Sequence, residues 1–362
     1  MRIAFYGSSL LSSYWNGAAT YYRGLIRALA ARGHAVTFYE PDAFGRQERR
    51  DIEPPDWCRV VVWRPDAAGL AGVAAEAAHA DVVVKASGVG VLDDEILAAV
   101  TAAAAPHALR IFWDVDAPAT LALLEVEPEH LLRRALPGLD GVLTYGGGVS
   151  VEADYRRLGA RTCVSIFNAL DPTTHHPVPP DPRFAADLAF LGNRLPDREA
   201  RVGRFFFGPA EALPEARFLL GGAGWEPGAV PRNVRVLGHV PTADHNAFNC
   251  TPRAVLNISR ESMASRGFSP ATRVFEAAGA GACLVTDAWE GIETILAPGR
   301  EVIVARDGRD VTEALAGLTP ERARAVGAAA RERVLAEHTY DLRALTVEAT
   351  LGELAARKAE AA

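Results

Sequence analysis

Short runs of apolar and β-branched residues alternate with longer Ala- and Leu-rich stretches along the whole chain. The short runs are apolar throughout, as is typical of strands buried on both faces of a parallel sheet. The longer stretches repeat apolar residues at helical spacing, as Tyr21, Leu25 and Leu29 do before a closing Gly33. This alternation indicates βαβ units and parallel sheets. It predicts strands at Ile3–Tyr6, Val36–Tyr39, Arg59–Val62, Val82–Lys85, Arg110–Trp113, Val142–Tyr145, Cys163–Ile166, Leu188–Leu191, Arg217–Leu220, Val234–Leu237, Ala254–Ile258, Cys283–Thr286 and Glu301–Val304, and helices after Pro270, Glu290, Pro320 and Tyr340.

The alternation is interrupted at residues 168–182, which read NALDPTTHHPVPPDP. So many prolines and polar residues disfavour regular structure, and 362 residues are enough for two domains. We expect a first domain at 1–168, a linker at 169–182 and a second domain at 183–340, with the helical tail 341–362 completing the first. Open parallel sheets bind ligands at the carboxyl ends of their strands, so we expect the chemistry on strand-to-helix turns that face a cleft between the domains.

Composition and charge exclude several classes of protein. Hydrophobic residues make up 49%, charged residues 23%, and the net charge is −7, which argues against nucleic acid or an anionic membrane surface as the partner. The first residues, MRIAFYG, lack the apolar region of a signal peptide, and no run of 18 apolar residues follows. We therefore expect a cytoplasmic protein without a transmembrane segment. Its four cysteines (Cys58, Cys163, Cys250 and Cys283) are too widely spaced for a zinc site and are expected to be buried free thiols.

The motif with most chemical content is RESMASRGFSPATRVFEAAGAGACLVTD, residues 260–287. Ser269-Pro270 predicts a capped helix start. The backbone amides of 267–272, apart from that of Pro270, would then be free to bind an anion, with Arg266 and Arg273 adding charge. Glu276, one turn later, can accept the two hydroxyls of a ribose. The alternative is an ordinary capped helix with Glu276 on a solvated face.

Within this motif, FEAAGAGACLVTD resembles the E-A-x-A-x-G signature of GT-B glycosyltransferases, with Gly279 where that pattern has its second Ala. The resemblance covers most of the chain and is nearest to the CgeB-like group, named from spore-maturation proteins. It rests on IFWDVDAP (111–118), NALDPTTHHPV (168–178), AFLGNRLPDR (189–198), VRVLGHVPTADHNAFN (234–249), LNISRESMASRGFSPATRVFEAA (256–278) and HTYDLRA (338–344).

The resemblance implies an α/β fold of two Rossmann-like domains facing a central cleft, with the nucleotide-sugar on the second domain and the acceptor on the first. Glu276 would hold the ribose, the turn 267–272 the diphosphate and sugar, and the turn after Gly238 the base. Retaining enzymes of the glycogen-synthase type carry a second Glu eight positions before the ribose Glu, where this chain has Phe268, so inversion or retention stays open. The expected donor-binding residues are Asn16, Gly17, Asn193, Arg194, His239, Arg266, Gly267, Phe268, Ser269, Thr272, Arg273 and Glu276.

Two further turns lie in the predicted first domain. The loop 7–17 contains Asn16-Gly17, which resembles a glycine-containing turn that reaches the donor phosphate and the acceptor in GT-B enzymes; the alternative is a plain βα connection. Its glycines lack the G-x-G-x-x-G spacing of a nicotinamide site. In the turn after 110–113, Asp114 or Asp116 could be the general base that deprotonates an acceptor hydroxyl, or Asp116 could be only a helix cap. Asp114-Val115-Asp116 spells D-x-D, but outside the predicted nucleotide domain, so we expect no metal site.

We expect His245 at a helix start and His175 and His176 solvated in the linker, while Lys85 could meet phosphate or acceptor at a strand end. The sequence thus predicts a metal-independent glycosyltransferase, without a cofactor, that uses a UDP-, GDP- or dTDP-sugar. Its acceptor, whether a small molecule, a glycan or a protein, is not identified by the sequence. Three alternatives remain: a nucleotide-sugar 2-epimerase of the same fold, an inactive sugar-nucleotide-binding assembly protein and, more weakly, an NAD-dependent oxidoreductase.

Overall fold

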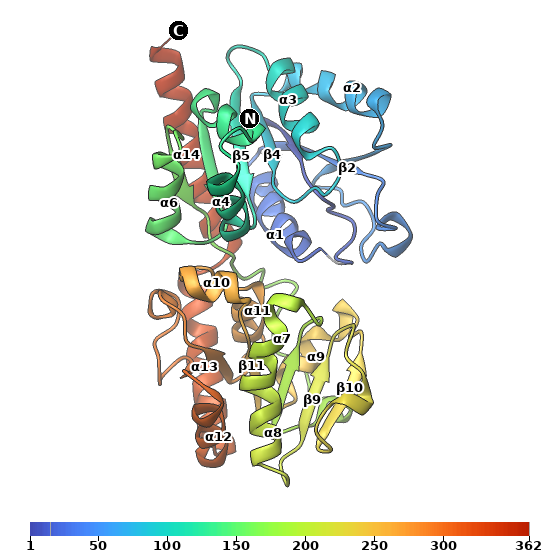
Figure 1. Cartoon of the computed structure of the whole chain (residues 1–362), viewed down its shortest axis with the longest axis vertical. Coiled ribbons are helices and arrows are strands. Elements are labelled where there is room, and N and C mark those ends of the chain that lie inside the picture. Colours follow the sequence, from blue (N-terminus) through green and yellow to red (C-terminus); the bar gives the residue numbers. More distant parts are fainter. Residues whose placement is uncertain (15, 362) are drawn as a thin grey trace. The chain divides into compact units, whose positions relative to one another are not determined.

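The computed structural model describes residues 1–14 and 16–361. Trp15, in the predicted loop 7–17, and Ala362, the last residue of the predicted tail, lie outside the described residues. The chain forms two compact units, Met1–Asn168 together with the C-terminal segment from Tyr340, and Ala169–Thr339. Each unit is a parallel sheet flanked by helices (Figure 1). Within the described residues, no helix combines the length and the apolar character that a membrane span requires.

The first unit is built on a seven-stranded sheet in the order β3-β2-β1-β4-β5-β6-β7. All neighbouring pairs are parallel. After β3 the chain returns to the other side of β1, so the strand order reverses between β1 and β4. The strands are β1 Arg2–Tyr6, β2 Ala35–Pro41, β3 Arg59–Trp63, β4 Val82–Ala86, β5 Leu109–Asp114, β6 Gly141–Thr144 and β7 Cys163–Ser165, and the helices are α1 Ala18–Ala31, α2 Ala67–Ala75, α3 Asp93–Ala103, α4 Ala117–Val126, α5 Leu131–Ala135, α6 Gly148–Arg157 and α14 Tyr340–Glu360.

The second unit repeats this topology in a six-stranded parallel sheet, in the order β10-β9-β8-β11-β12-β13. Here the strand order reverses between β8 and β11. A π-helical turn, Gly203–Phe207, joins α7 to α8. The strands are β8 Leu188–Leu191, β9 Phe218–Gly221, β10 Val234–Gly238, β11 Ala254–Asn257, β12 Leu284–Asp287 and β13 Ile303–Ala305, and the helices are α7 Pro196–Val202, α8 Gly208–Ala212, α9 His245–Cys250, α10 Glu261–Arg266, α11 Thr272–Gly279, α12 Gly308–Gly317 and α13 Pro320–Glu337.

The C-terminal helix α14 packs against α1 of the first unit. Their close approach depends on Gly24, because a Cβ there would lie 2.1 Å from a ring carbon of Tyr340. Behind this contact, the hydroxyl of Tyr21 accepts a 3.0 Å hydrogen bond from Trp113 Nε1 and donates a 2.9 Å bond to the carbonyl of Ile166. These buried contacts join the end of the chain to the sheet of the first unit.

The predicted strands are confirmed to within one or two residues, and so are the helices after Pro320 and from Tyr340. The helix predicted after Glu290 is wrong, because only a short 3₁₀ turn, Ile292–Thr294, forms after Gly291, whose φ is +96°. The expected N-cap at Ser269 is also wrong. The helix begins at Thr272 with Ala271 as its N-cap, because Gly267 and Phe268 both have positive φ and turn the chain before it can become helical.

Candidate functional site

The strand order places a candidate site in the second unit, between β8 and β11. Ligands of open parallel sheets bind outside the carboxyl ends of the strands where the order reverses. Two turns flank this point: residues 192–195 lead from β8 into α7, and residues 258–271 lead from β11 through α10 into α11. The side chains of these turns and of the first turns of α7 and α11 are therefore those to consider first.

Arg198, in the first turn of α7, is a partly buried cation, and no ion pair is found for it among the described residues. Burial lowers its pKa to about 10, and the positive charges of Arg273 and Arg260 act in the same direction against the attraction of Asp197. Its Nη2 donates a 2.5 Å hydrogen bond to the carbonyl of Asn193, while its Nε is buried with no partner among the described residues. The negative charge of a bound anion would stabilise the charged form of this guanidinium.

Arg273, in the first turn of α11, is a second partly buried cation, with its side chain 16% exposed. Burial is the main cause that lowers its pKa. Its Nη1 lies 3.5 Å from Asn249 Oδ1 and its Nη2 3.8 Å from Glu276 Oε2. Among the described residues, Arg273 Nε, Asn249 Nδ2 and Ser269 Oγ are buried without a hydrogen-bond partner. Buried polar atoms in proteins nearly always have a hydrogen-bond partner, so these three atoms are available to a polar ligand.

Glu276 lies one turn further along α11 and is only 7% exposed. Burial acts to raise its pKa, but electrostatic interactions with His175, Arg273 and His245 and a hydrogen bond from Thr272 outweigh burial, so the pKa lies below its ordinary value. The carboxylate is therefore ionised. Its two oxygens face different neighbours, with Oε2 towards Arg273 and Oε1 3.9 Å from His175 Nε2.

Two histidines complete the surroundings of Glu276. His175 was expected to be solvated, but this is wrong: it is 6% exposed, because its segment packs onto α11. A Cβ at Gly279 would lie 2.3 Å from Leu170 Cδ1 and 3.1 Å from the carbonyl oxygen of His175. His245 begins α9 as predicted, and burial lowers its pKa to about 4. One ligand atom from each of His175, His245 and Glu276 lies within 4.8 Å of the other two.

The turn before α11 has an unusual backbone. Gly267 has a φ of +71° and Phe268 a φ of +45°, a region that costs a residue with a side chain roughly 1–2 kcal/mol. The amide of Gly267 donates to the carbonyl of Met263 (3.1 Å) and that of Phe268 to the carbonyl of Glu290 (2.6 Å). These two amides are therefore not available to an anion, contrary to the sequence-based expectation. In the described part of the chain, no backbone partner is found for the amides of Ser269, Ala271 and Thr272.

The other predicted donor-binding residues of this unit have other hydrogen-bond or ion-pair partners or lie on exposed turns. Asn193 Oδ1 accepts a 2.9 Å hydrogen bond from the amide of Ala223, so this side chain holds two turns together. Arg194 forms an exposed 2.6 Å ion pair with Glu199. His239 is exposed on the turn after β10, and Arg266 is the last residue of α10. The donor roles of these four residues stay predictions.

In the first unit, the loop 7–17 is held from within by its own polar groups. Asn16 is 7% exposed, accepts from Ser8 Oγ (3.0 Å) and donates to the carbonyls of Ser9 (2.9 Å) and Ser12 (3.1 Å). Its amide is therefore committed to the loop, and its predicted contact with the donor stays a prediction. Gly17 is exposed at the start of α1, where an added Cβ would meet no atom within 4 Å.

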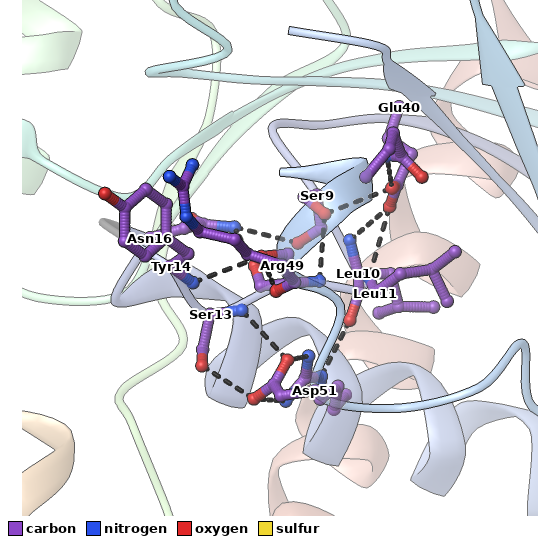
Figure 2. Close-up of polar contacts among 12 residues, drawn as sticks. Ser9, Leu10, Leu11, Ser13, Tyr14, Asn16, Glu40, Arg49 and Asp51 are labelled. Carbon is purple, nitrogen blue, oxygen red and sulfur yellow. Dashed lines mark hydrogen bonds and ion pairs between the residues drawn. The ribbon is translucent and has the colours of Figure 1, made fainter. Parts of the chain in front are cut away.

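Two carboxylates fix the shape of this loop (Figure 2). Glu40, which is fully buried, accepts hydrogen bonds from the amides of Leu10 (2.6 Å) and Leu11 (3.2 Å) and from Ser9 Oγ (3.1 Å). Asp51 accepts from the amide and hydroxyl of Ser13, and from both terminal nitrogens of the guanidinium of Arg23. The loop is thus built on side chains from β2 and from the segment that follows β2.

Asp114, a predicted catalytic base, is completely buried at the end of β5. Oδ1 accepts from Ser87 Oγ (2.7 Å), from the amide of Asp116 (2.9 Å) and from Thr120 Oγ1 (3.0 Å), and Oδ2 accepts from the hydroxyl of Tyr155. Burial raises its pKa, partly offset by these hydrogen bonds. The catalytic role stays a prediction, and the geometry favours a structural one.

The neighbouring polar groups of this unit have local roles. The carbonyl of Asp116 accepts the first hydrogen bonds of α4, from Ala119 and Thr120. Its side chain makes no capping hydrogen bond to the helix, and its predicted catalytic role is likewise untested. Lys85 is buried in an ion pair with Asp93 (2.5 Å), which occupies its ammonium group.

Comparison with known proteins agrees with the fold described above. Residues 198–349 match a family described as glycosyl transferase-like, which covers the CgeB-like proteins. The whole chain superposes on solved glycosyltransferases. Sucrose-phosphate synthase from Thermosynechococcus elongatus gives a TM-score of 0.70 at 15% identity, over 99% of this chain and 100% of the other.

The fold is GT-B. HepE of Anabaena, in complex with UDP and glucose, gives a TM-score of 0.67 at 13% identity, over 98% of this chain and 100% of HepE. An α-glucosyltransferase (AGT) in complex with UDP gives 0.68 at 10% identity, over 97% and 100%. No curated protein sequence matches the chain. The predicted GT-B architecture and the resemblance to CgeB-like proteins are therefore confirmed, while these low identities establish the fold of the chain rather than its substrates.

The sequence analysis missed Arg198, the buried position of His175 and the partly buried position of His245 in this GT-B protein. Arg198 follows Pro196-Asp197 and precedes Glu199, a context typical of the solvated first turn of a helix. Its place directly after a predicted strand was the one signal that could have identified it, because the first turn after a strand at the switch point contacts ligands in such sheets.

Proposed function

We propose that this GT-B protein transfers a sugar from a nucleoside-diphosphate sugar to an acceptor hydroxyl without a metal ion. The donor lies on the second unit, with its diphosphate beside Arg198 and Arg273 and its ribose beside Glu276. The UDP complexes of HepE and AGT, which share the fold, support a uridine nucleotide as the first candidate.

The observation that carries the proposal is the pair of partly buried arginines beside an ionised glutamate at the point of strand reversal. Arg198 has no ion-pair partner among the described residues, and Arg273 only approaches Glu276 to 3.8 Å. A diphosphate would supply the missing negative charge and accept from the unpartnered Nε atoms of both. The carboxylate of Glu276, one helical turn away, can accept hydrogen bonds from the 2′- and 3′-hydroxyls of ribose.

The same groups account for catalysis. As the bond between the sugar and the diphosphate breaks, negative charge grows on the leaving phosphate. Fixed guanidinium groups and the free amides at the start of α11 stabilise that charge more in the transition state than in the ground state. Two arginines then take the part that a divalent cation plays elsewhere, so the reaction needs no added metal ion.

The proposal can be tested by isothermal titration calorimetry, in which UDP, GDP and dTDP are each titrated into the protein in the presence of EDTA. One diphosphate is expected to bind, and Arg198→Ala and Glu276→Gln to weaken it roughly 10- to 100-fold, since each removes a charged hydrogen bond worth about 1.5–3 kcal/mol. Arg204→Ala is the matched control, because Arg204 lies in the π-helical turn directly after α7 but is exposed. Equal binding by all variants, or no binding of any nucleotide, refutes the proposal.

A reaction with the corresponding nucleotide-sugar separates transfer from epimerisation. The proposal predicts that free nucleoside diphosphate accumulates with an acceptor. Conversion of the nucleotide-sugar into an isomer without release of nucleoside diphosphate would instead assign a 2-epimerase.

A further inference from the structure

We propose that His175, His245 and Glu276 form a binding site for a transition-metal ion such as Zn²⁺, and that the bound ion excludes the nucleotide. The binding of metal stands on the geometry of these three residues alone. The exclusion of the nucleotide rests on the function proposed above, because Glu276 is then needed by both ligands.

The three side chains come from separate segments that the fold brings together. His175 lies between β7 and β8, His245 opens α9, and Glu276 lies on α11. One nitrogen or oxygen of each lies within 4.8 Å of the others, and His175 Nε2 is 3.9 Å from Glu276 Oε1. In a tetrahedral zinc site, ligand atoms about 2.0–2.1 Å from the metal lie about 3.4 Å apart. Changes of roughly 1 Å in side-chain position therefore suffice to close the site.

Each imidazole is oriented by a second hydrogen bond. His245 Nε2 lies 3.2 Å from the carbonyl oxygen of Val240. Because a carbonyl can only accept, Nε2 carries the proton, and Nδ1 of the neutral ring keeps its lone pair. His175 Nδ1 lies 3.0 Å from Thr174 Oγ1, which leaves Nε2 to face Glu276. Partners of this kind hold most metal-binding histidines in one tautomer and one orientation.

The charges around the site permit a divalent ion but limit its affinity. Glu276 offers Oε1 on the side of His175, while Oε2 stays with Arg273 at 3.8 Å. The nearby guanidinium repels a metal ion, so we expect weaker binding than at a closed structural zinc site. Two histidines and one glutamate supply three ligands and leave the fourth position to water, the coordination of an open zinc site.

Occupation of this site changes what Glu276 can do. A carboxylate oxygen bound to Zn²⁺ has its charge and its lone pairs committed to the metal. It then no longer accepts the hydrogen bonds of a ribose as an unbound carboxylate does. Zn²⁺ and the nucleoside diphosphate should therefore compete, although the transfer reaction itself needs no metal.

The first test is a titration of ZnCl₂ into the whole protein against a chromophoric chelator. The wild type should bind one Zn²⁺, and His175→Asn and His245→Asn should each weaken binding at least about 10-fold. His176→Asn is the matched control, because His176 is exposed and adjacent in sequence, and it should leave binding unchanged. The same affinity in the wild type, His175→Asn and His245→Asn would overturn the proposal.

Substitution with Co²⁺ identifies the ligands independently of affinity. Ligands from two imidazoles and one carboxylate predict visible absorption bands without a thiolate charge-transfer band in the near ultraviolet. A thiolate band would move the metal to a cysteine, such as the partly exposed Cys250, and would overturn the proposal. Retained far-ultraviolet circular dichroism in each variant shows that the loss of metal is local.

A UDP titration with and without Zn²⁺ then separates the two proposals. The expected result is an apparent UDP affinity that falls as Zn²⁺ rises, and that no longer does so in His245→Asn. Zn²⁺ binding without binding of UDP, GDP or dTDP would refute the proposed function and leave the metal site standing. UDP binding that is indifferent to bound Zn²⁺ would overturn the exclusion.

Discussion

Arg201 Nη2 donates a 2.6 Å charged hydrogen bond to Asp287 Oδ2, and Asp287 is completely buried at the end of β12. The same carboxylate accepts from the amide and the hydroxyl of Ser259 at 3.0–3.2 Å. Arg201 also reaches Glu261, the first residue of α10, through Nη1 at 2.8 Å. This pair therefore fixes the path of the chain from β11 towards the turn that precedes α11.

Arg201→Ala should destabilise the protein by about 3–5 kcal/mol, because it leaves the buried Asp287 charge without its cation. Burial already raises the pKa of Asp287, and Arg201 opposes that rise. Where Asp287 is ionised, its burial destabilises the folded state, and this destabilisation is larger without Arg201. The difference in unfolding free energy between wild type and variant should therefore shrink as pH falls towards the pKa of unfolded aspartate, because Asp287 becomes protonated. Urea unfolding of the wild type and of Arg201→Ala at several pH values measures this difference in unfolding free energy.

In the same experiment, Arg194→Ala is the control, since its ion pair is exposed and should contribute little. A deficit of Arg201→Ala that is small, or that does not depend on pH, would contradict the role given to the pair.

Asp51 should stabilise the first unit above its unfolded pKa and cease to do so in acid. Burial acts to raise its pKa, but hydrogen bonds from Arg23 and Ser13 prevail and lower the pKa to about 2. The stabilisation, about 2 kcal/mol, is complete above the unfolded pKa of about 3.9 and is lost as pH falls through about 2. The stability difference between wild type and Asp51→Asn should therefore vanish in that range. Glu321→Gln, at a carboxylate whose side chain is 75% exposed, should show a much smaller difference.

Gly291→Ala should disturb the turn that carries Phe268. A Cβ at Gly291 would lie 2.3 Å from Phe268 Cδ1, and the φ of +96° is itself unfavourable for alanine. We expect a loss of about 2–4 kcal/mol, from strain and overlap together. Gly299→Ala is the matched control, because its φ is +79° but an added Cβ meets no atom within 4 Å. Equal losses in the two variants, measured by denaturant unfolding, would rule out a contribution from Phe268.

Asp114→Asn should lower stability by about 3 kcal/mol, since an amide nitrogen would replace an oxygen that accepts from buried donors. Tyr155→Phe, which removes one of these donors, should cost less. Both effects are read from thermal unfolding beside transferase activity. If Asp114→Asn folded with wild-type stability yet lost turnover, the catalytic interpretation of Asp114 would be favoured over the structural one.

The strands of both sheets could be predicted because each is a short apolar run whose burial depends on its own residues. Val82–Ala86, for example, is buried at every position. The alternation of strand and helix then predicted parallel sheets, and the resemblance of the segment around Glu276 to a known signature implied the GT-B class. The start of α11 could not be placed in the same way. It depends on the hydrogen bond from Phe268 to Glu290, a contact between turns that no local pattern records.

The candidate site was predictable only where its chemistry coincided with a sequence motif. Glu276 and Arg273 lie in such a motif, and their side chains approach each other to 3.8 Å. His175 was misplaced because a proline-rich segment is typical of exposed linkers, whereas packing of this segment onto α11 buries it. Arg198 is recognised as a ligand-binding candidate only once the strand order places β8 beside β11.

The central claim is that a nucleoside diphosphate binds to the second unit. A crystal structure of the protein with UDP, grown without added metal, tests it most directly. We predict that the diphosphate lies against Arg198 and Arg273, with both ribose hydroxyls hydrogen-bonded to Glu276. Nucleotide found on the first unit, or a second unit in which side chains fill this position while UDP is absent, would contradict the account.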